Sequence, residues 1–176
     1  EQVLFVKALE TMEELCRLTG REGSAYAQKA KALKENLNRY FWSEELGAYI
    51  DSYESGKNHV PRHANIFAVV FDVATESQKE SIARNVLLNP DVPQITTPYF
   101  KFFELDALCR LGYLDQVMER IKSYWGGMLD RGAVTFWEEF DPFWQKPVSR
   151  LGRQPHLPAG EVFPGCAAHR PGVQDL

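Results

Sequence analysis

The sequence predicts an all-α fold in which helices form two concentric layers, an (α/α) toroid. Segments that are apolar almost all round alternate along the chain with segments that are apolar on one face only. The link from a buried helix to the next amphipathic helix is short, whereas the link back to the following buried helix is long and rich in aromatic and polar residues. Because loops on a rigid scaffold carry function, the long loops at one end are the expected place for a site.

The first two segments are predicted helices, the second of them amphipathic. In the first, which ends near residue 18 and is closed by Gly20, apolar residues recur at steps of four, three and four; they are Phe5, Leu9, Met12 and Cys16. Ser24 is the expected N-cap of the second helix. The apolar stripe of that helix is formed by Tyr26, Ala30, Leu33, Leu37 and Phe41.

A long connection, residues 43–61, leads to a helix of a different kind. Within the connection, residues 47–53 favour a short strand or an extended loop. The helix predicted over residues 62–74 is apolar around nearly its whole circumference, so it must be buried on most sides. Thr75 and Gln78 then form a capping-box pattern, which starts the next, amphipathic helix almost without a loop. That helix stops at Asn89 and Pro90.

The same order repeats once more. Thr97 and Pro98 read as an N-cap followed by proline at the first helical position, after a second long connection. The helix predicted over residues 99–111 is apolar nearly all round, and Gly112 ends it. An amphipathic helix over residues 115–124 follows, and the sequence predicts that the helical pattern stops there.

The third long loop, residues 126–142, combines glycine, aromatic and acidic residues. Flat aromatic faces can stack on a pyranose ring, and carboxylates can move protons or stabilise a cation. These residue types together therefore indicate a sugar site.

The composition excludes other classes of function. The chain has 176 residues and a net charge of −4, so it can bury a sizeable core but has no basic footprint for nucleic acid. It has no run of 18 apolar residues, so no membrane span is predicted, and its three widely spaced cysteines give no metal-cluster pattern. The chain opens directly in a helical pattern, which indicates a fragment of a longer protein. An open helical-repeat solenoid is the rival fold, but no fixed-period repeat supports it.

Three phrases resemble one family, the bacterial α-L-rhamnosidases of glycoside hydrolase family 78. Residues 62–69, RHANIFAV, are similar to its RQANIFAL, and residues 97–105, TPYFKFFEL, to its TPYFKFYEL. Residues 124–129 and 132–138, YWGGML and GAVTFWE, resemble its YWGGML and GATTFWE. The likeness covers residues 1–142. It implies the C-terminal half of an (α/α)6 six-hairpin catalytic barrel, so the missing N-terminal half is an implied partner.

The resemblance also implies a reaction, the hydrolysis of terminal α-L-rhamnosyl groups with inversion. One carboxylic acid protonates the leaving oxygen and a second carboxylate takes a proton from water. The family's base falls on Glu138, whereas its acid lies upstream of this chain. Rhamnose-containing carbohydrate is the implied substrate, with no metal and no organic cofactor. The sequence does not indicate a compartment.

Other residues near the predicted site have a functional and a structural interpretation. Trp125 and Trp137 could stack on sugar or seal the mouth of the barrel, and Tyr99 could contact sugar or pack in the core. His63 stands where the family has glutamine and could line the site. Glu104 and Asp106 lie on an otherwise apolar helix, and since a buried carboxylate is costly unless paired, they could support the site or simply form salt bridges. Glu139 is expected to be structural or solvated.

The C-terminal segment, residues 143–176, has a different character. Six of the ten prolines fall from Pro142 to Pro171, and no helical period survives. With permitted codons, residues 151–175 read one nucleotide later give WGASPIYLLGKYFLGAPHIGRGYKT, which is similar to the family's closing helix. We hypothesise that this irregular tail is non-native, out-of-frame translation caused by a gene lesion or a sequencing error between residues 142 and 151. A natural proline-rich disordered tail is the alternative.

Two other functions stay open at this point. One is a different exo-glycosidase, or a sugar isomerase, on the same (α/α)6 barrel. The other is a non-enzymatic helical-repeat interaction module. Without the closing helix and the N-terminal half, the chain by itself is expected to be inactive.

Overall fold

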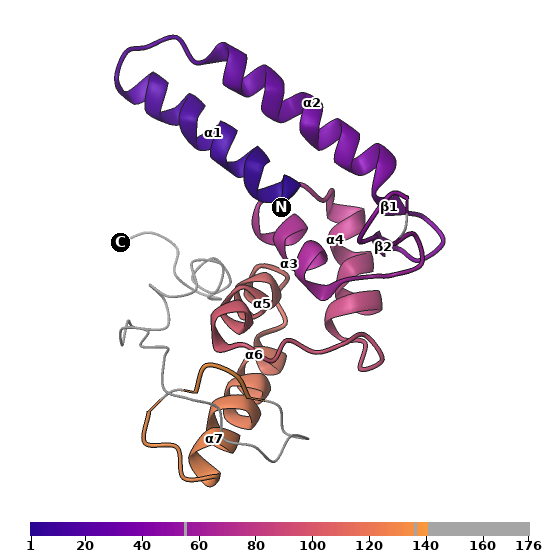
Figure 1. Cartoon of the computed structure of the whole chain (residues 1–176), viewed down its shortest axis with the longest axis vertical. Helices are drawn as coiled ribbons and strands as arrows, with labels where there is room; N and C mark the ends of the chain where they lie inside the picture. Colours follow the sequence, from indigo (N-terminus) through magenta and orange to yellow (C-terminus); the bar gives the residue numbers. More distant parts are fainter. Residues whose placement is uncertain (55, 136, 141–176) are drawn as a thin grey trace, which may run out of the picture. The chain divides into compact units, whose positions relative to one another are not determined.

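The computed structural model describes residues 1–54, 56–135 and 137–140, which are mainly helical (Figure 1). The fold is all-α, as the sequence predicts, apart from one short two-stranded ribbon among the described residues. Two compact units divide the chain, one formed by residues 1–93 and one that begins at Gln94. None of the helices in the described part of the chain is long and apolar enough to cross a membrane.

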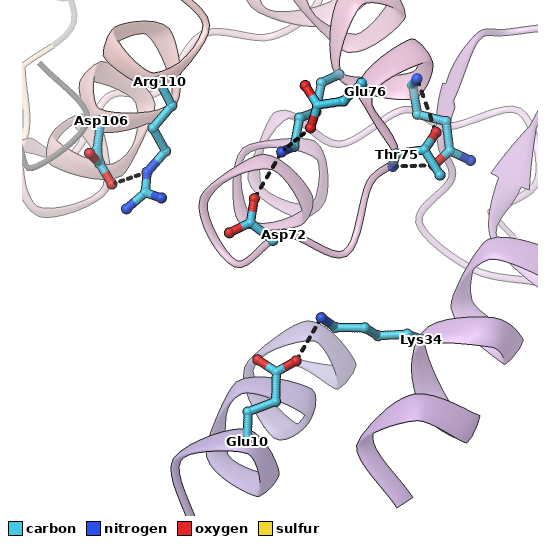
Figure 2. Close-up of polar contacts among 9 residues, drawn as sticks. Glu10, Lys34, Asp72, Thr75, Glu76, Asp106 and Arg110 are labelled. Atoms are coloured by element: carbon cyan, nitrogen blue, oxygen red, sulfur yellow. Dashed lines mark hydrogen bonds and ion pairs between the residues drawn. The ribbon is translucent and has the colours of Figure 1, made fainter. Parts of the chain in front are cut away.

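The first unit opens with an antiparallel hairpin of α1 (Gln2–Leu18) and α2 (Ser24–Tyr40) (Figure 1). Gly20 makes the turn at φ +66°, a conformation that favours glycine. Across the hairpin the Lys34 ammonium lies 2.6 Å from the Glu10 carboxylate (Figure 2). The predicted stripe of α1 is half right. Leu9 and Cys16 are buried together with Val3 and Val6, whereas Phe5 and Met12 are more than two-fifths exposed.

The predicted N-cap of α2 is wrong by one residue. Ser24 is the first residue of α2, and Gly23 occupies the N-cap position without a side-chain cap. The Glu22 carboxylate instead accepts a hydrogen bond of 2.7 Å from the Ser24 amide. The longer glutamate side chain reaches the start of the helix from one residue further upstream. Hydrogen bonds from the Ser24 hydroxyl and from the Ser24 amide lower the pKa of the Glu22 carboxyl.

A buried amide ties the long connection to the next helix. A ribbon of β1 (Trp42–Ser43) and β2 (Ala48–Tyr49) forms here, and only β2 lies within residues 47–53, where the sequence predicts extended structure. Asn65, on α3 (Arg62–Val70), accepts a bond of 2.8 Å from the Tyr49 amide and donates one of 2.9 Å to the Tyr49 carbonyl. It also donates to Pro61 at the start of α3. One fully buried side chain thereby fixes β2 against α3.

A buried arginine holds the second long connection of this unit. Arg62 is 2% exposed, and its guanidinium donates hydrogen bonds of 2.9–3.1 Å to four backbone carbonyls, those of Leu87, Asn89, Val92 and Pro93. The first two carbonyls lie at the end of a helix, where the backbone dipole favours a positive charge. Arg62 therefore supplies hydrogen-bond donors to the backbone carbonyls of a turn that has few N–H donors of its own.

The link from α3 to α4 (Glu76–Ile82) is short, as predicted. Asp72 adopts φ +52°, and the Val73 and Ala74 amides both donate to the Ala68 carbonyl. Thr75 and Gln78 form the predicted capping box (Figure 2). The Lys79 ammonium lies 2.8 Å from the carboxylates of both Asp72 and Glu76, so two ion pairs stabilise the turn. The helix continues as a π-helix, η1 (Ala83–Leu87).

The second unit contains α5 (Pro98–Arg110) and α6 (Leu114–Ile121), followed by η2 (Lys122–Gly126) and α7 (Gly127–Asp130). Pro98 is the first residue of α5 after the N-cap Thr97, and Gly112 adopts φ +81° just past its end, as predicted. The expected all-round burial of α5 is only partly right. Its buried face includes the charged Lys101, Glu104 and Asp106, and the aromatic side chains nearer its start are half-buried or exposed; they are Tyr99, Phe100, Phe102 and Phe103.

Replacement of Arg62 by lysine tests the role of the buried guanidinium. A lysine ammonium carries the charge but cannot reach four separated carbonyls from one nitrogen. We expect Arg62→Lys to lower the free energy of unfolding by about 3 kcal/mol, since bonds from charged groups contribute about 1.5–3 kcal/mol each. Urea unfolding followed by circular dichroism measures the change. Arg21→Lys, at an exposed position, is the matched control, and equal stabilities of the two variants would contradict the assigned role.

Candidate active site

The helix that leads into the candidate site runs further than the sequence predicts. The helical pattern was expected to stop at Tyr124, with Gly126 and Gly127 in the loop. Instead η2 and α7 continue the helix to Asp130. Both glycines have ordinary helical φ angles of −58° and −60°. The π-turn of η2 accommodates one extra residue in the helix. In this extended helix Tyr124 and Met128 are both buried.

A small aromatic core lies between this helix and the returning loop. Tyr124, Met128 and Phe140 are buried together, and Trp125, Ala133 and Trp137 pack against them. The Phe140 ring meets the Tyr124 ring edge-on at 5.4 Å between centroids and lies 5.8 Å from the Trp137 ring. Such pairs stabilise beyond the area they bury. The core therefore fixes both ends of the segment 137–140.

Glycine is required at one position of this core. A Cβ atom built on Gly127 would lie 3.1 and 3.2 Å from two carbons of the Phe140 ring. A Cβ on Gly126 would meet nothing within 4 Å. The double glycine thus has a packing reason at Gly127 and none of that kind at Gly126.

Thr96, just upstream of α5, joins the loop to this core. Its carbonyl accepts hydrogen bonds from the Tyr124 hydroxyl, at 2.6 Å, and from the Phe140 amide, at 2.8 Å. Its hydroxyl donates to the Glu139 carboxylate at 3.0 Å. Burial raises the pKa of the Tyr124 hydroxyl above its ordinary value, so the hydroxyl remains a donor at neutral pH. Glu139 is thus held by the loop, in agreement with its expected structural role.

Buried charges lie behind Tyr124. The Glu104 carboxylate, fully buried, forms ion pairs with Lys101 at 2.7 Å and with Arg120 at 2.8 Å. The Lys101 ammonium also lies 5.4 Å from the centre of the Tyr124 ring, which suits a cation–π contact. The salt bridge expected for Glu104 is therefore present. Asp106 likewise forms its expected pair, with Arg110 at 3.0 Å (Figure 2).

The predicted catalytic residue differs from its neighbour in its surroundings. Glu138 is exposed between the half-buried Trp137 and the hydrogen-bonded Glu139. Among the residues that the structure describes, the Glu138 carboxylate makes no hydrogen bond or ion pair, so it is solvated. The Arg131 guanidinium lies over the Phe140 ring, 5.1 Å from its centroid. A carboxylate presented to water in this way can accept a proton from it.

The other predicted site residues fall into two groups. Trp125 and Trp137 pack against the aromatic core, and Glu138 directly follows Trp137 in the chain. Tyr99 is 67% exposed at the start of α5, so it is not packed in the core, and its ring meets Phe103 edge-on at 5.6 Å. His63 is exposed on α3, in the first unit, and its place in the site remains a prediction.

Sequence reasoning did not identify Thr96, Lys101 or Arg120 as parts of this region. A signal for Lys101 was present in the sequence, whereas none marked Arg120. A glutamate on an otherwise apolar helix requires a cation, and Lys101 stands one turn before Glu104 on the same helix. No comparable signal marks Thr96, whose contacts reach 28 and more residues along the chain.

Hairpins of helices that end in an aromatic and acidic loop define the class of protein, an all-α glycosidase domain. Within this class the chain belongs to the family of the bacterial alpha-L-rhamnosidase 6 hairpin glycosidase domain, whose model matches residues 1–155. Residues 156–176 lie beyond that match. The expected relationship to the α-L-rhamnosidases is thereby confirmed.

Two solved structures are similar to the chain. A rhamnosidase from Klebsiella oxytoca with rhamnose bound is 32% identical, with a TM-score of 0.70 over 80% of this chain. A GH78 family rhamnosidase of Bacillus sp. GL1 is 29% identical, with a TM-score of 0.70 over 77% of this chain. The chain spans 27% and 15% of the lengths of these two proteins. A comparison with curated protein sequences gives no match.

The paired glycines allow a test of the aromatic core. In Gly127→Ala the new methyl group must displace the Phe140 ring, and we expect the free energy of unfolding to fall by about 1 kcal/mol. In Gly126→Ala the methyl group enters open space on a helical backbone, and we expect a gain of about 0.5 kcal/mol. Thermal unfolding followed by tryptophan fluorescence measures both. Changes of the same sign and size would contradict the described packing of Phe140.

Proposed function

We propose that this chain forms the part of an inverting α-L-rhamnosidase that carries the general base, Glu138. The observation that carries the proposal is the contrast between two adjacent carboxylates: Glu139 is held by Thr96, whereas Glu138 is solvated beside the aromatic core. A base that activates water needs access to that water and a fixed backbone. Membership of the family and the bound rhamnose in a similar structure support the choice of sugar.

In the proposed reaction, Glu138 accepts a proton from a water molecule as that water attacks the anomeric carbon. A general acid protonates the leaving oxygen from the opposite face of the sugar, and the two carboxyl groups stand about 6.5–9.5 Å apart in inverting glycosidases. Trp125, Trp137 and Tyr99 offer rings that can stack on the sugar, and His63 is a further proposed contact. The reaction requires neither a metal nor an organic cofactor.

The general acid is proposed to come from an N-terminal half of the barrel, which is the partner of this chain. The chain spans 27% of the Klebsiella oxytoca rhamnosidase, so the remaining hairpins of a six-hairpin domain must come from elsewhere. Sequencing of the DNA on both sides of the codons for residues 1–176 would give this half. The same experiment tests the hypothesis of an out-of-frame tail, because it shows the reading frame of the codons for residues 143–176. Those residues lie outside the part of the chain that the structure describes.

Replacement of Glu138 by glutamine in the complete barrel tests the base. The amide cannot accept a proton from water, so we expect kcat to fall by about 10²–10⁴-fold on an aryl α-L-rhamnoside, with KM little changed. Proton NMR of the first-formed sugar should show the β anomer for the unaltered enzyme. Asp130→Asn, an exposed carboxylate on α7, is the control. Equal turnover in Glu138→Gln and Asp130→Asn would contradict the role of Glu138 as the base.

The isolated 176-residue chain is expected to hydrolyse no rhamnoside. It would have the base but neither the acid nor the opposite wall of the site, and each carboxylate is needed in an inverting mechanism. Release of nitrophenol from an aryl α-L-rhamnoside, measured at high protein concentration, gives the answer. Turnover that disappears in Glu138→Gln would contradict the need for an N-terminal half.

A further inference from the structure

We infer that Thr96, Tyr124 and Glu139 form a clip that positions Glu138, and this inference rests on the proposed function of Glu138 as the base. The side chain of Glu138 makes no hydrogen bond or ion pair among the described residues, so its direction depends on its backbone. Residues 139 and 140, which follow directly, are the ones held by Thr96. The clip therefore holds the two residues that directly follow the base.

The carbonyl of Thr96 is the centre of the clip. It accepts the Tyr124 hydroxyl at 2.6 Å and the Phe140 amide at 2.8 Å. A carbonyl oxygen has two lone pairs, so both acceptor positions are occupied by protein and no water can take one without breaking a bond. The Thr96 hydroxyl adds a third bond, to Glu139. Three bonds from one residue fix the loop in position and in direction.

The clip has a rigid support. Tyr124 packs against Phe140, and the Lys101 ammonium lies over its ring. Lys101 in turn is paired with Glu104, which is fully buried and also paired with Arg120 from α6. A buried ion pair is costly to break, because one charge is then left without a partner. Movement of Tyr124 would disturb this pair, so the support resists displacement of the loop.

The three residues of the clip are positioning residues. Within the proposed mechanism they set where the Glu138 carboxylate meets the attacking water, and a shift of about 1 Å in such a group can cost about 10²-fold in rate. They are not expected to contribute to the binding of the sugar. Their loss should therefore lower kcat and leave KM nearly unchanged.

Hydrogen exchange of the full 176-residue chain tests the clip without any enzymatic activity. In Tyr124→Phe, which keeps the ring, and in Thr96→Val, we expect the Phe140 amide to exchange about tenfold faster, with the amides of α5 unchanged. Tyr26→Phe, on α2, is the control. Unchanged exchange at Phe140, or equal acceleration in α5 and at Phe140, would overturn the clip.

Kinetics of the complete barrel test the positioning role. We expect Thr96→Val and Glu139→Ala each to lower kcat about tenfold at constant KM, and the double variant to lose no more than either alone, because both remove the same bond. Thr96→Ser and Glu139→Gln keep a donor and an acceptor, so they should restore kcat.

Two outcomes would overturn the positioning role. In the first, the variants loosen the loop in the exchange experiment yet keep the unaltered kcat. In the second, Thr96→Ser and Glu139→Gln fail to restore turnover. A complete, folded barrel that hydrolyses no rhamnoside would overturn the base role of Glu138 and with it the catalytic meaning of the clip. The exchange experiment would still decide whether Thr96 holds the loop, so the two failures can be told apart.

Discussion

A polar group taken out of water must find a partner inside the protein, and this constraint organises both units. In the first unit, Arg62 and Asn65 are buried on α3 and bind the backbone of the two long connections of that unit. In the second unit, Glu104 is buried on α5 and joins it to α6 through Arg120. Helices whose sequences are almost entirely apolar are thus joined to neighbouring segments by a few buried charged or amide side chains. The buried side chains of the helices thereby help to position the long connections.

Local features of the fold could be predicted from the sequence because their causes are local. The capping box of Thr75 and the glycine turns after α1 and α5 depend on residues within a few positions. The errors have a different origin. The helix continues past Tyr124 because Phe140 packs onto Gly127, a contact that no local pattern reveals. Phe5 and Met12 have helical spacing in α1, but spacing alone does not say which apolar face is covered.

The candidate site likewise contains residues that could be predicted from the sequence and residues that could not. The resemblance pointed to Glu138 and the tryptophans, and the cost of burying a carboxylate pointed to Glu104 as a paired residue. Thr96 could not be found, because its role depends on partners 28 and 43 residues away. Two neighbouring glutamates, alike in sequence, thereby take different parts. Glu139 forms part of the support, and Glu138 faces the solvent. Adjacent positions with one bound and one solvated carboxylate suit a loop that must be both rigid and reactive.

The contacts of Arg62 have an evolutionary consequence. Four hydrogen bonds from its guanidinium go to backbone carbonyls of residues 87–93, so these bonds depend on the path of that turn and not on the identity of its side chains. Mutations can therefore accumulate there without loss of the anchor, provided that the chain keeps its length and path. Related proteins should diverge in the exposed residues of this turn, such as Asp91, while insertions in it remain rare. As long as the backbone of this turn keeps its path, its exposed side chains can change without breaking the hydrogen bonds of Arg62.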